Sequence, residues 1–147
     1  IHWRPPEYQT YPLFAGDALK ILRAGGLVGV GSHGNMQGLG YHWEMQALTS
    51  GGATPHEVLK AATIGSSEVI GRALDIGSLE PGKFADLLIL DENPLEDIRN
   101  TLSLEFVMKN GRLYDADTLD EVWPRQRPLG KRWFQDEALA RGVNKPN

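Results

Sequence analysis

Between residues 17 and 31 the apolar residues change from helical spacing to a continuous run. Apolar residues of 17–22 have helical spacing, Asp17 lies near the start of that helix, and Gly25-Gly26 ends it. The run 27–31 is then continuously apolar, which is typical of a strand buried on both faces of a parallel sheet. Residues 1–12 contain three prolines and show no period, so we expect an extended lead-in. The pattern predicts an α/β unit.

A glycine-rich loop over residues 32–44 is expected directly after this strand. It carries His33 and His42, two of the four histidines of the chain. Ligand sites of α/β folds cluster at the carboxyl ends of strands, so this loop is the first place to look for chemistry. A helix is expected to follow through Met45 and Leu48 and to break at Gly51-Gly52.

The strongest helix signal of the chain lies at residues 54–57. Thr54 supplies an N-cap, Pro55 suits the first helical position, and Glu57 completes a capping box. The predicted helix runs to residue 62 and resumes over 66–74. His56 falls in its first turn, where we expect a solvated side chain.

After residue 75 the pattern changes to short strands. A turn is predicted over 80–83, followed by a buried strand over 86–90. Residues 104–109 and 112–115 flank Asn110-Gly111, the strongest short hairpin signal, because both turn positions must accept a positive φ. From residue 123 onward the chain reads as an irregular tail.

These elements do not form a closed structure by themselves. A strand buried in a parallel sheet needs neighbours on both sides, and a few short antiparallel strands need a facing layer. We therefore expect an upstream segment of the same protein, or other subunits, to complete both layers. The amino terminus, IHWRPP, has neither an initiator Met nor the pattern of a signal peptide. We expect it to be cut, and the compartment stays open.

Composition excludes several classes of function. The chain of 147 residues has a formal charge of −4 and no cluster of Lys and Arg longer than two, which disfavours nucleic-acid binding. The aromatic and basic tail is expected to pack across the domain surface. No apolar run approaches the roughly 20 residues of a membrane span. Because cysteine is absent, chemistry must use histidines, carboxylates, hydroxyls or a cofactor.

Three segments carry a resemblance to a known family. They are GSLEPGKFADLLILD (77–91), NPLEDI (93–98) and VMKNGR (107–112). Over residues 18–122 the chain resembles the C-terminal part of amidohydrolase-superfamily enzymes of the imidazolonepropionase-like and prolidase-like kinds. The resemblance implies an α/β fold: residues 1–76 form the C-terminal part of a (β/α)8 barrel, its last strand and helices. Residues 77–122 then supply short strands of a small composite β-sandwich, and 123–147 are the tail.

The same resemblance implies a metal-dependent hydrolase that acts on the C–N bond of an amide, cyclic amide or peptide-like substrate. Members of the family carry an aspartate after the last barrel strand, as metal ligand and general base. The matching stretch here is Gly31-Ser32-His33, so that aspartate is absent. An imidazole can bind zinc and act as a base, which makes His33 the candidate catalytic and metal-binding residue. The family's other ligands lie upstream of this chain.

His42 and Glu44 are the candidate substrate-binding residues. They converge with His33 only if the loop 34–40 folds back, and the spacing does not dictate this. The alternative for His33 is a structural histidine. The alternative for His42 and Glu44 is a helix start with Trp43 in the core.

Two other interpretations compete with these. Residues 29–34 match G-x-G-x-x-G, but no helix follows directly and no acidic residue ends a second strand, which disfavours dinucleotide binding. The absent aspartate also leaves open a catalytically inactive relative, or a fragment with an assembly or ligand-binding role.

Overall fold

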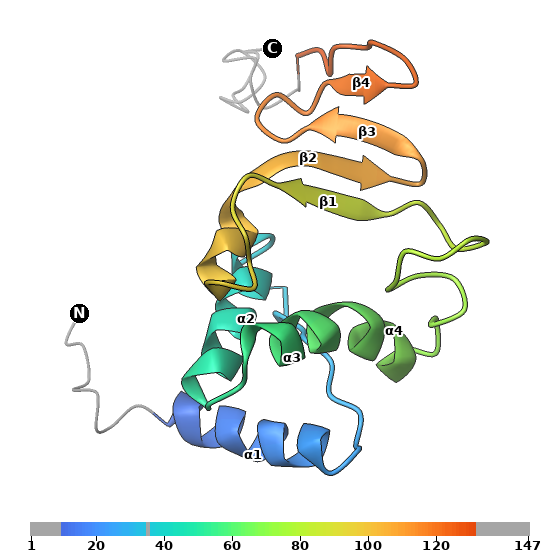
Figure 1. The fold of residues 1–147 in the computed structure, drawn as a ribbon. Helices are drawn as coiled ribbons and strands as arrows, with labels where there is room; N and C mark the ends of the chain where they lie inside the picture. The colour runs from blue at the N-terminus through green and yellow to red at the C-terminus, as the bar shows by residue number, and fades with distance from the viewer. Residues whose placement is uncertain (1–9, 35, 132–147) are drawn as a thin grey trace, which may run out of the picture.

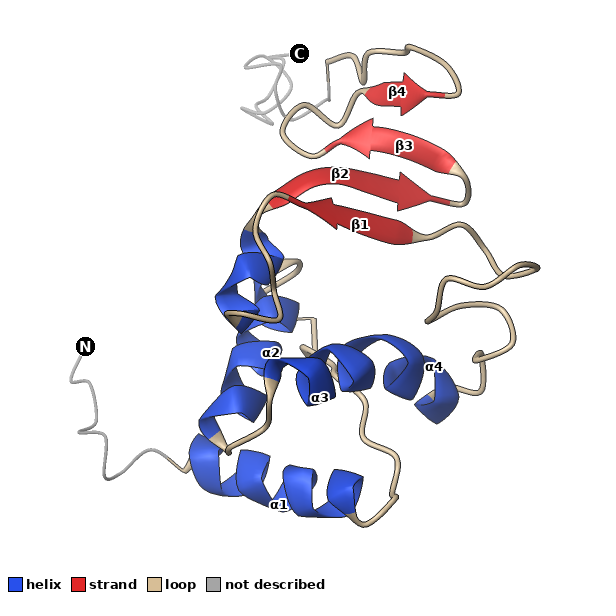
Figure 2. Cartoon of the chain, in the orientation of Figure 1, coloured by secondary structure: helices blue, strands red, loops and turns tan. Residues whose placement is uncertain are grey.

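Helices and sheet form two separate layers in the computed structural model, which describes residues 10–34 and 36–131 (Figure 1). The helical layer is built by the first half of the described chain, and a four-stranded antiparallel sheet by the second (Figure 2). The α/β class is confirmed at this level. The elements are α1 (Tyr11–Arg23), α2 (Leu39–Ser50), α3 (Pro55–Lys60), the π-helix η2 (Ala61–Gly65), α4 (Ser66–Val69), the 3₁₀-helix η3 (Ile98–Leu102), β1 (Leu87–Leu90), β2 (Leu104–Lys109), β3 (Arg112–Asp115) and β4 (Glu121–Trp123).

Helix α1 begins earlier than predicted. It includes Tyr11 and Pro12, which the sequence pattern placed in an extended lead-in. A proline in the first turn fits a helix start, because the amide it lacks has no partner there. The predicted end is confirmed: Gly25 has a φ of 86°, the left-handed conformation that glycine adopts at little cost.

The prediction of a buried strand over residues 27–31 is wrong for this chain. The segment forms no strand, and Leu27 is 60% exposed. A strand requires a neighbour with which to share hydrogen bonds, and the described residues offer none there. The segment packs along a helix instead: the Val30 amide donates to Ser66 Oγ at 2.9 Å, and a Cβ on Gly29 would lie 3.2 Å from Ser66 Cα.

Helix α2 occupies much of the region predicted to be a glycine-rich loop. It starts at Leu39, so His42 and Glu44 lie in its first turns. Gly40 is buried, and a Cβ there would lie 2.9 Å from Ser32 Cβ. The alternative for His42 and Glu44, a helix start with Trp43 in the core, is met only in part: the helix starts here, but Trp43 is 49% exposed.

The capping box of α3 is confirmed. Thr54 Oγ1 accepts from the Glu57 amide, and a Glu57 carboxylate oxygen accepts from the Thr54 amide at 2.8 Å. Arg23 of α1 donates to both carboxylate oxygens, at 2.8 and 3.0 Å. These bonds, with Arg23 the main cause, lower the pKa of Glu57 to about 2. The cap therefore also joins α1 to α3.

Glu57→Gln is expected to lower the thermal unfolding midpoint at pH 7 but to have almost no effect near pH 2. The folded-state pKa is depressed, so the stabilisation is complete above about 4.5 and is lost as the pH falls toward about 2. Thermal unfolding of both proteins across this range, with Glu68→Gln of α4 as the control, measures the difference. A constant difference at every pH would contradict the ionic origin of the effect.

A widened turn separates α3 from α4. Side chains also donate to two carbonyls of the π-helix η2: the Tyr41 hydroxyl donates to the Ala62 oxygen at 2.6 Å, and Ser66 Oγ to the Ala61 oxygen at 2.8 Å. Helix α4 ends at Val69, short of the predicted residue 74, because the chain turns at Gly71 with a φ of 70°.

The sheet is a meander in the order β1-β2-β3-β4. The predicted hairpin is confirmed with its bounds, and Asn110 and Gly111 have φ values of 50° and 74°. Strand β1 confirms most of the predicted 86–90 strand, but Leu88 and Ile89 are exposed rather than buried. Strand β4 extends into the predicted tail; residues 132–147 of that tail lie outside the described part.

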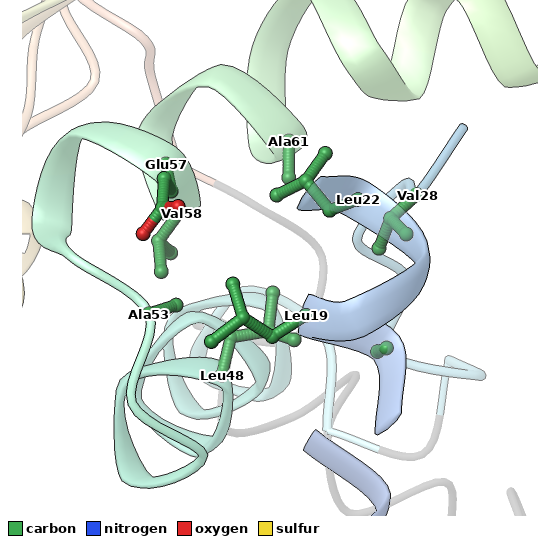
Figure 3. Close-up of a pocket in the computed structure, with 9 residues that line it drawn as sticks. Leu19, Leu22, Val28, Leu48, Ala53, Glu57, Val58 and Ala61 are labelled. Atoms are coloured by element: carbon green, nitrogen blue, oxygen red, sulfur yellow. The ribbon is translucent and has the colours of Figure 1, made fainter. Parts of the chain in front are cut away.

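The core is small and lies within the helical layer. Leu19 and Leu22 of α1 face Leu48, Val58 and Ala61 of the other helices, around a void of only about 10 Å³ (Figure 3). Many large apolar side chains are exposed, including Phe14, Leu27, Leu74, Leu79 and Leu88. Among the described residues, no helix combines the length and apolar character that crossing a membrane requires.

Candidate functional site

A groove of about 660 Å³ separates the helices from the sheet. Its size falls within the range of small-molecule sites. One wall comes from α2, η2 and α4, the other from β1 and β2, and the segment 76–79 closes one side. The lining is mainly apolar, with the following polar residues among it: Tyr41, His42, Thr63, Ser66, Ser67, Ser78, Asp86, Thr101 and Lys109.

His42 is the one predicted site residue that lines this groove. Its side chain is half-buried, and Nδ1 lies 2.9 Å from Thr101 Oγ1 of η3. Burial lowers the pKa of His42, because the charged imidazolium loses hydration. Burial thus favours the neutral imidazole, and the contact with Thr101 ties it to an element 59 positions away.

His33 lies outside the groove. It sits in the turn after residues 27–32, is exposed, and has a φ of 54°. Among residues with a side chain, His is one of the few that adopt this left-handed conformation with some frequency. The turn thus presents the imidazole to solvent, and the structure shows no hydrogen bond from it to the described residues.

Glu44 is exposed on α2, two positions after His42. Residues two apart on a helix do not face each other, so these side chains point in different directions. No group of three or more His, Asp or Glu side chains arranged to hold a metal occurs in residues 10–34 and 36–131. The donor set of the described chain therefore does not fit a metal ion by itself.

Polar groups of the segment 77–91 form hydrogen bonds that hold its own turn. Lys83 Nζ donates to Ser78 Oγ at 2.5 Å and to Glu80 Oε1 at 3.3 Å, across the predicted turn. Gly82 has a φ of 94° and the Lys83 amide donates to the Glu80 oxygen, as that turn requires. The Lys83 side chain is only 11% exposed, because the turn folds Ser78 and Glu80 around it.

Asp86 holds the β2–β3 hairpin from its position directly before strand β1. Its Oδ1 accepts from the Asn110 amide at 2.6 Å, and its Oδ2 forms an ion pair with Lys109. Both contacts, that with Lys109 being the larger, lower the pKa of Asp86. This carboxylate therefore acts as a turn anchor at one end of the groove.

Thr101 was not identified from the sequence. It lies in η3, where Asp97 caps the helix by accepting from the Arg99 amide at 2.9 Å. Thr101 is 4% exposed, and its hydroxyl donates to the Ile98 oxygen at 2.8 Å. A cap of this kind predicts a helical turn, but no local pattern shows that Thr101 contacts His42.

Comparisons with known proteins identify the family. The model of the Amidohydrolase family matches residues 16–114. An imidazolonepropionase from Shouchella clausii is 43% identical over 63 residues, covering 41% of this chain and 14% of that protein. An ochratoxinase from Aspergillus niger is 39% identical over 97 residues, covering 63% of this chain and 20% of that protein. The chain thus spans a fifth or less of these curated relatives.

Solved structures give the same result. A Xaa-Pro dipeptidase with bound methionine in its active site superposes with a TM-score of 0.62 at 26% identity, covering 71% of this chain and 26% of that one. A putative prolidase from Bifidobacterium longum gives a TM-score of 0.61 at 32% identity, covering 87% of this chain and 30% of that one. The chain belongs to the amidohydrolase family.

Proposed function

We propose that this chain is the C-terminal portion of a hydrolase that cleaves the C–N bond of an amide, cyclic amide or peptide-like substrate. The observation that carries the proposal is the family match, which extends over residues 16–114. The solved Xaa-Pro dipeptidase, by its name an enzyme of dipeptides, supports a peptide-like substrate.

The proposal includes a division of the chain. Residues 1–76 belong to the end of a (β/α)8 barrel, 77–122 to a composite β-sandwich, and 123–147 to a tail. The two-layer arrangement supports it, with the helices in one layer and the strands in the other (Figure 1). So does the exposure of Leu27 beside the helices and of Leu88 in the sheet, because large apolar side chains of this kind are normally covered. The missing N-terminal half, or other subunits, would cover them.

A divalent metal, zinc by the family resemblance, belongs to the proposal only with ligands from outside the described residues. His33 would contribute one nitrogen, and zinc sites of enzymes use three protein ligands. When bound, such a metal supplies an activated water. The described residues alone do not supply a complete donor set for it.

The described side chains have separable roles in the proposal. His33, on an exposed turn, is the candidate catalytic and metal-binding group. Because its imidazole is exposed, it can bind a metal together with ligands from another segment. His42 and Glu44 are the candidate substrate-binding groups, His42 from the groove wall and Glu44 from the exposed face of α2.

A second candidate is a catalytically inactive relative with an assembly or ligand-binding role. The observation that favours it is the histidine at the position where the family resemblance calls for an aspartate.

Native mass spectrometry and an amidase assay on the complete polypeptide that contains this chain test the two candidates. The hydrolase proposal predicts a tightly bound divalent metal and metal-dependent cleavage of N-acyl amino acids or Xaa-Pro dipeptides, lost with chelator and regained with Zn²⁺. A metal-free protein inactive on both substrate classes would support the inactive relative instead.

A further inference from the structure

The turn that carries His33 is held by the start of helix α2. His33 and Gly34 have φ values of 54° and 78°, and two successive positive φ values are those of a tight turn. The chain then returns toward Ser32. Gly40, the second residue of α2, is buried, and a Cβ placed on it would lie 2.9 Å from Ser32 Cβ. The residue directly before His33 therefore packs against the backbone of Gly40.

A side chain on residue 40 would collide with Ser32. Carbon atoms pack at about 3.5–4.0 Å, so a Cβ on Gly40 would push Ser32 away by about 0.6 Å or more. Neither Cβ can rotate out of the way, because each is attached directly to the backbone. The Gly40 amide also donates to the Met36 oxygen at 2.7 Å, which holds the Gly40 backbone in place. The glycine therefore decides how closely Ser32 approaches α2.

The position of His33 depends on this contact. Its side chain is exposed, and within residues 10–34 and 36–131 it makes no hydrogen bond. The imidazole therefore takes its position from the backbone, which is fixed at Ser32, one residue earlier. Misplacement of a reacting group by about 1 Å can lower a rate about 100-fold, so a shift of Ser32 is large enough to matter. The contact joins two segments of this chain and needs no upstream partner.

We propose that Gly40 is a positioning residue: because it has no side chain, Ser32 packs closely against α2, and this sets the position of the His33 imidazole. That the position serves catalysis rests on the proposed function. The position itself does not, because it follows from a contact within this chain.

NMR of the complete polypeptide with ¹³C-labelled histidine tests the position of His33. His33→Asn identifies the His33 signals by their loss. We expect Gly40→Ala to shift the His33 Cα signal, which reports backbone conformation, but to leave it unchanged where Ser32→Gly has already removed the opposing Cβ. Gly16→Ala in α1, where a Cβ would lie 3.8 Å from its nearest neighbour, is the control. An unshifted signal in Gly40→Ala, or an equal shift in the Ser32→Gly background, would overturn the proposal.

Steady-state kinetics of the same proteins test the catalytic part. We expect Gly40→Ala to lower kcat roughly 10- to 100-fold with KM within about threefold of wild type, and Ser32→Gly/Gly40→Ala to match Ser32→Gly. A general loss of stability would not be rescued in this way. A shifted His33 signal with an unchanged kcat would refute the catalytic part.

Two further outcomes are decisive. If Gly40→Ala does not fold, the double variant is still expected to fold, and its failure to do so would overturn the proposal. A wild-type polypeptide without activity would refute the proposed function and leave the NMR result standing.

Discussion

Replacing Gly77 with alanine is expected to destabilise the chain by about 2–5 kcal/mol, through two separate costs. Gly77 has a φ of 95°, and a side chain in left-handed backbone costs about 1–2 kcal/mol. A Cβ there would also lie 2.3 Å from Ser67 Oγ, 2.8 Å from Ser67 Cβ and 3.0 Å from Ile64 Cα. Overpacking of this kind adds about 1–3 kcal/mol.

Gly82→Ala provides the matched control. Gly82 has nearly the same φ, 94°, but a Cβ there would meet nothing within 4 Å. Only the backbone cost applies, so its expected loss is about 1–2 kcal/mol. Urea unfolding of the wild-type chain and both variants measures how much each variant loses in free energy of unfolding. Equal losses in the two variants would show that the contact of Gly77 with Ser67 and Ile64 carries no steric cost.

The Gly77 contact explains part of the family fingerprint in physical terms. Residues 77–91 are specific enough to suggest a family, and their contacts hold the structure: Gly77 fits against Ser67 and Ile64, Lys83 bridges the turn, and Asp86 anchors the hairpin. The segment connects the helical layer to the sheet, and its geometry holds the two walls of the groove. Its observed contacts are structural.

The sequence predicted the local features well because their causes are local. The capping box at Thr54 and the turn at Asn110-Gly111 need only residues within a few positions of each other, and both are present as expected. The prediction of a strand over 27–31 was wrong because a strand does not depend on local sequence alone. An apolar run shows that a segment is suited to burial, but a strand exists only where another segment supplies its partner.

The candidate site was predicted less completely because its contacts are distant in sequence. His42 was chosen for its place after an apolar run, and it does line the groove. Its partner Thr101 follows 59 residues later in a separate 3₁₀-helix, and no spacing rule connects them. Convergence of Glu44 with His42 and His33 required the loop 34–40 to fold back, but the helix turns Glu44 away from His42.

Removing the imidazole of His33 is expected to lower kcat/KM of the complete hydrolase by roughly 100- to 10,000-fold, the usual contribution of a general acid–base group. His33→Asn is the suitable variant, because Asn tolerates the left-handed backbone at this position, where φ is 54°. Since His33 is exposed and makes no hydrogen bond to the described residues, the variant is expected to fold with a stability within about 0.5 kcal/mol of wild type.

Two further variants decide what the imidazole does. His33→Asp restores the carboxylate that the family resemblance places here, and it is expected to retain bound metal and more activity than His33→Asn. His56→Asn, at an exposed histidine in the first turn of α3, should leave both unchanged. Steady-state kinetics and metal analysis of all four proteins give the comparison. If His33→Asn keeps its activity within threefold and its metal content, His33 is neither base nor ligand. In that case the reaction does not use the histidine at the family's aspartate position, and another residue of the complete protein must supply the acid–base group.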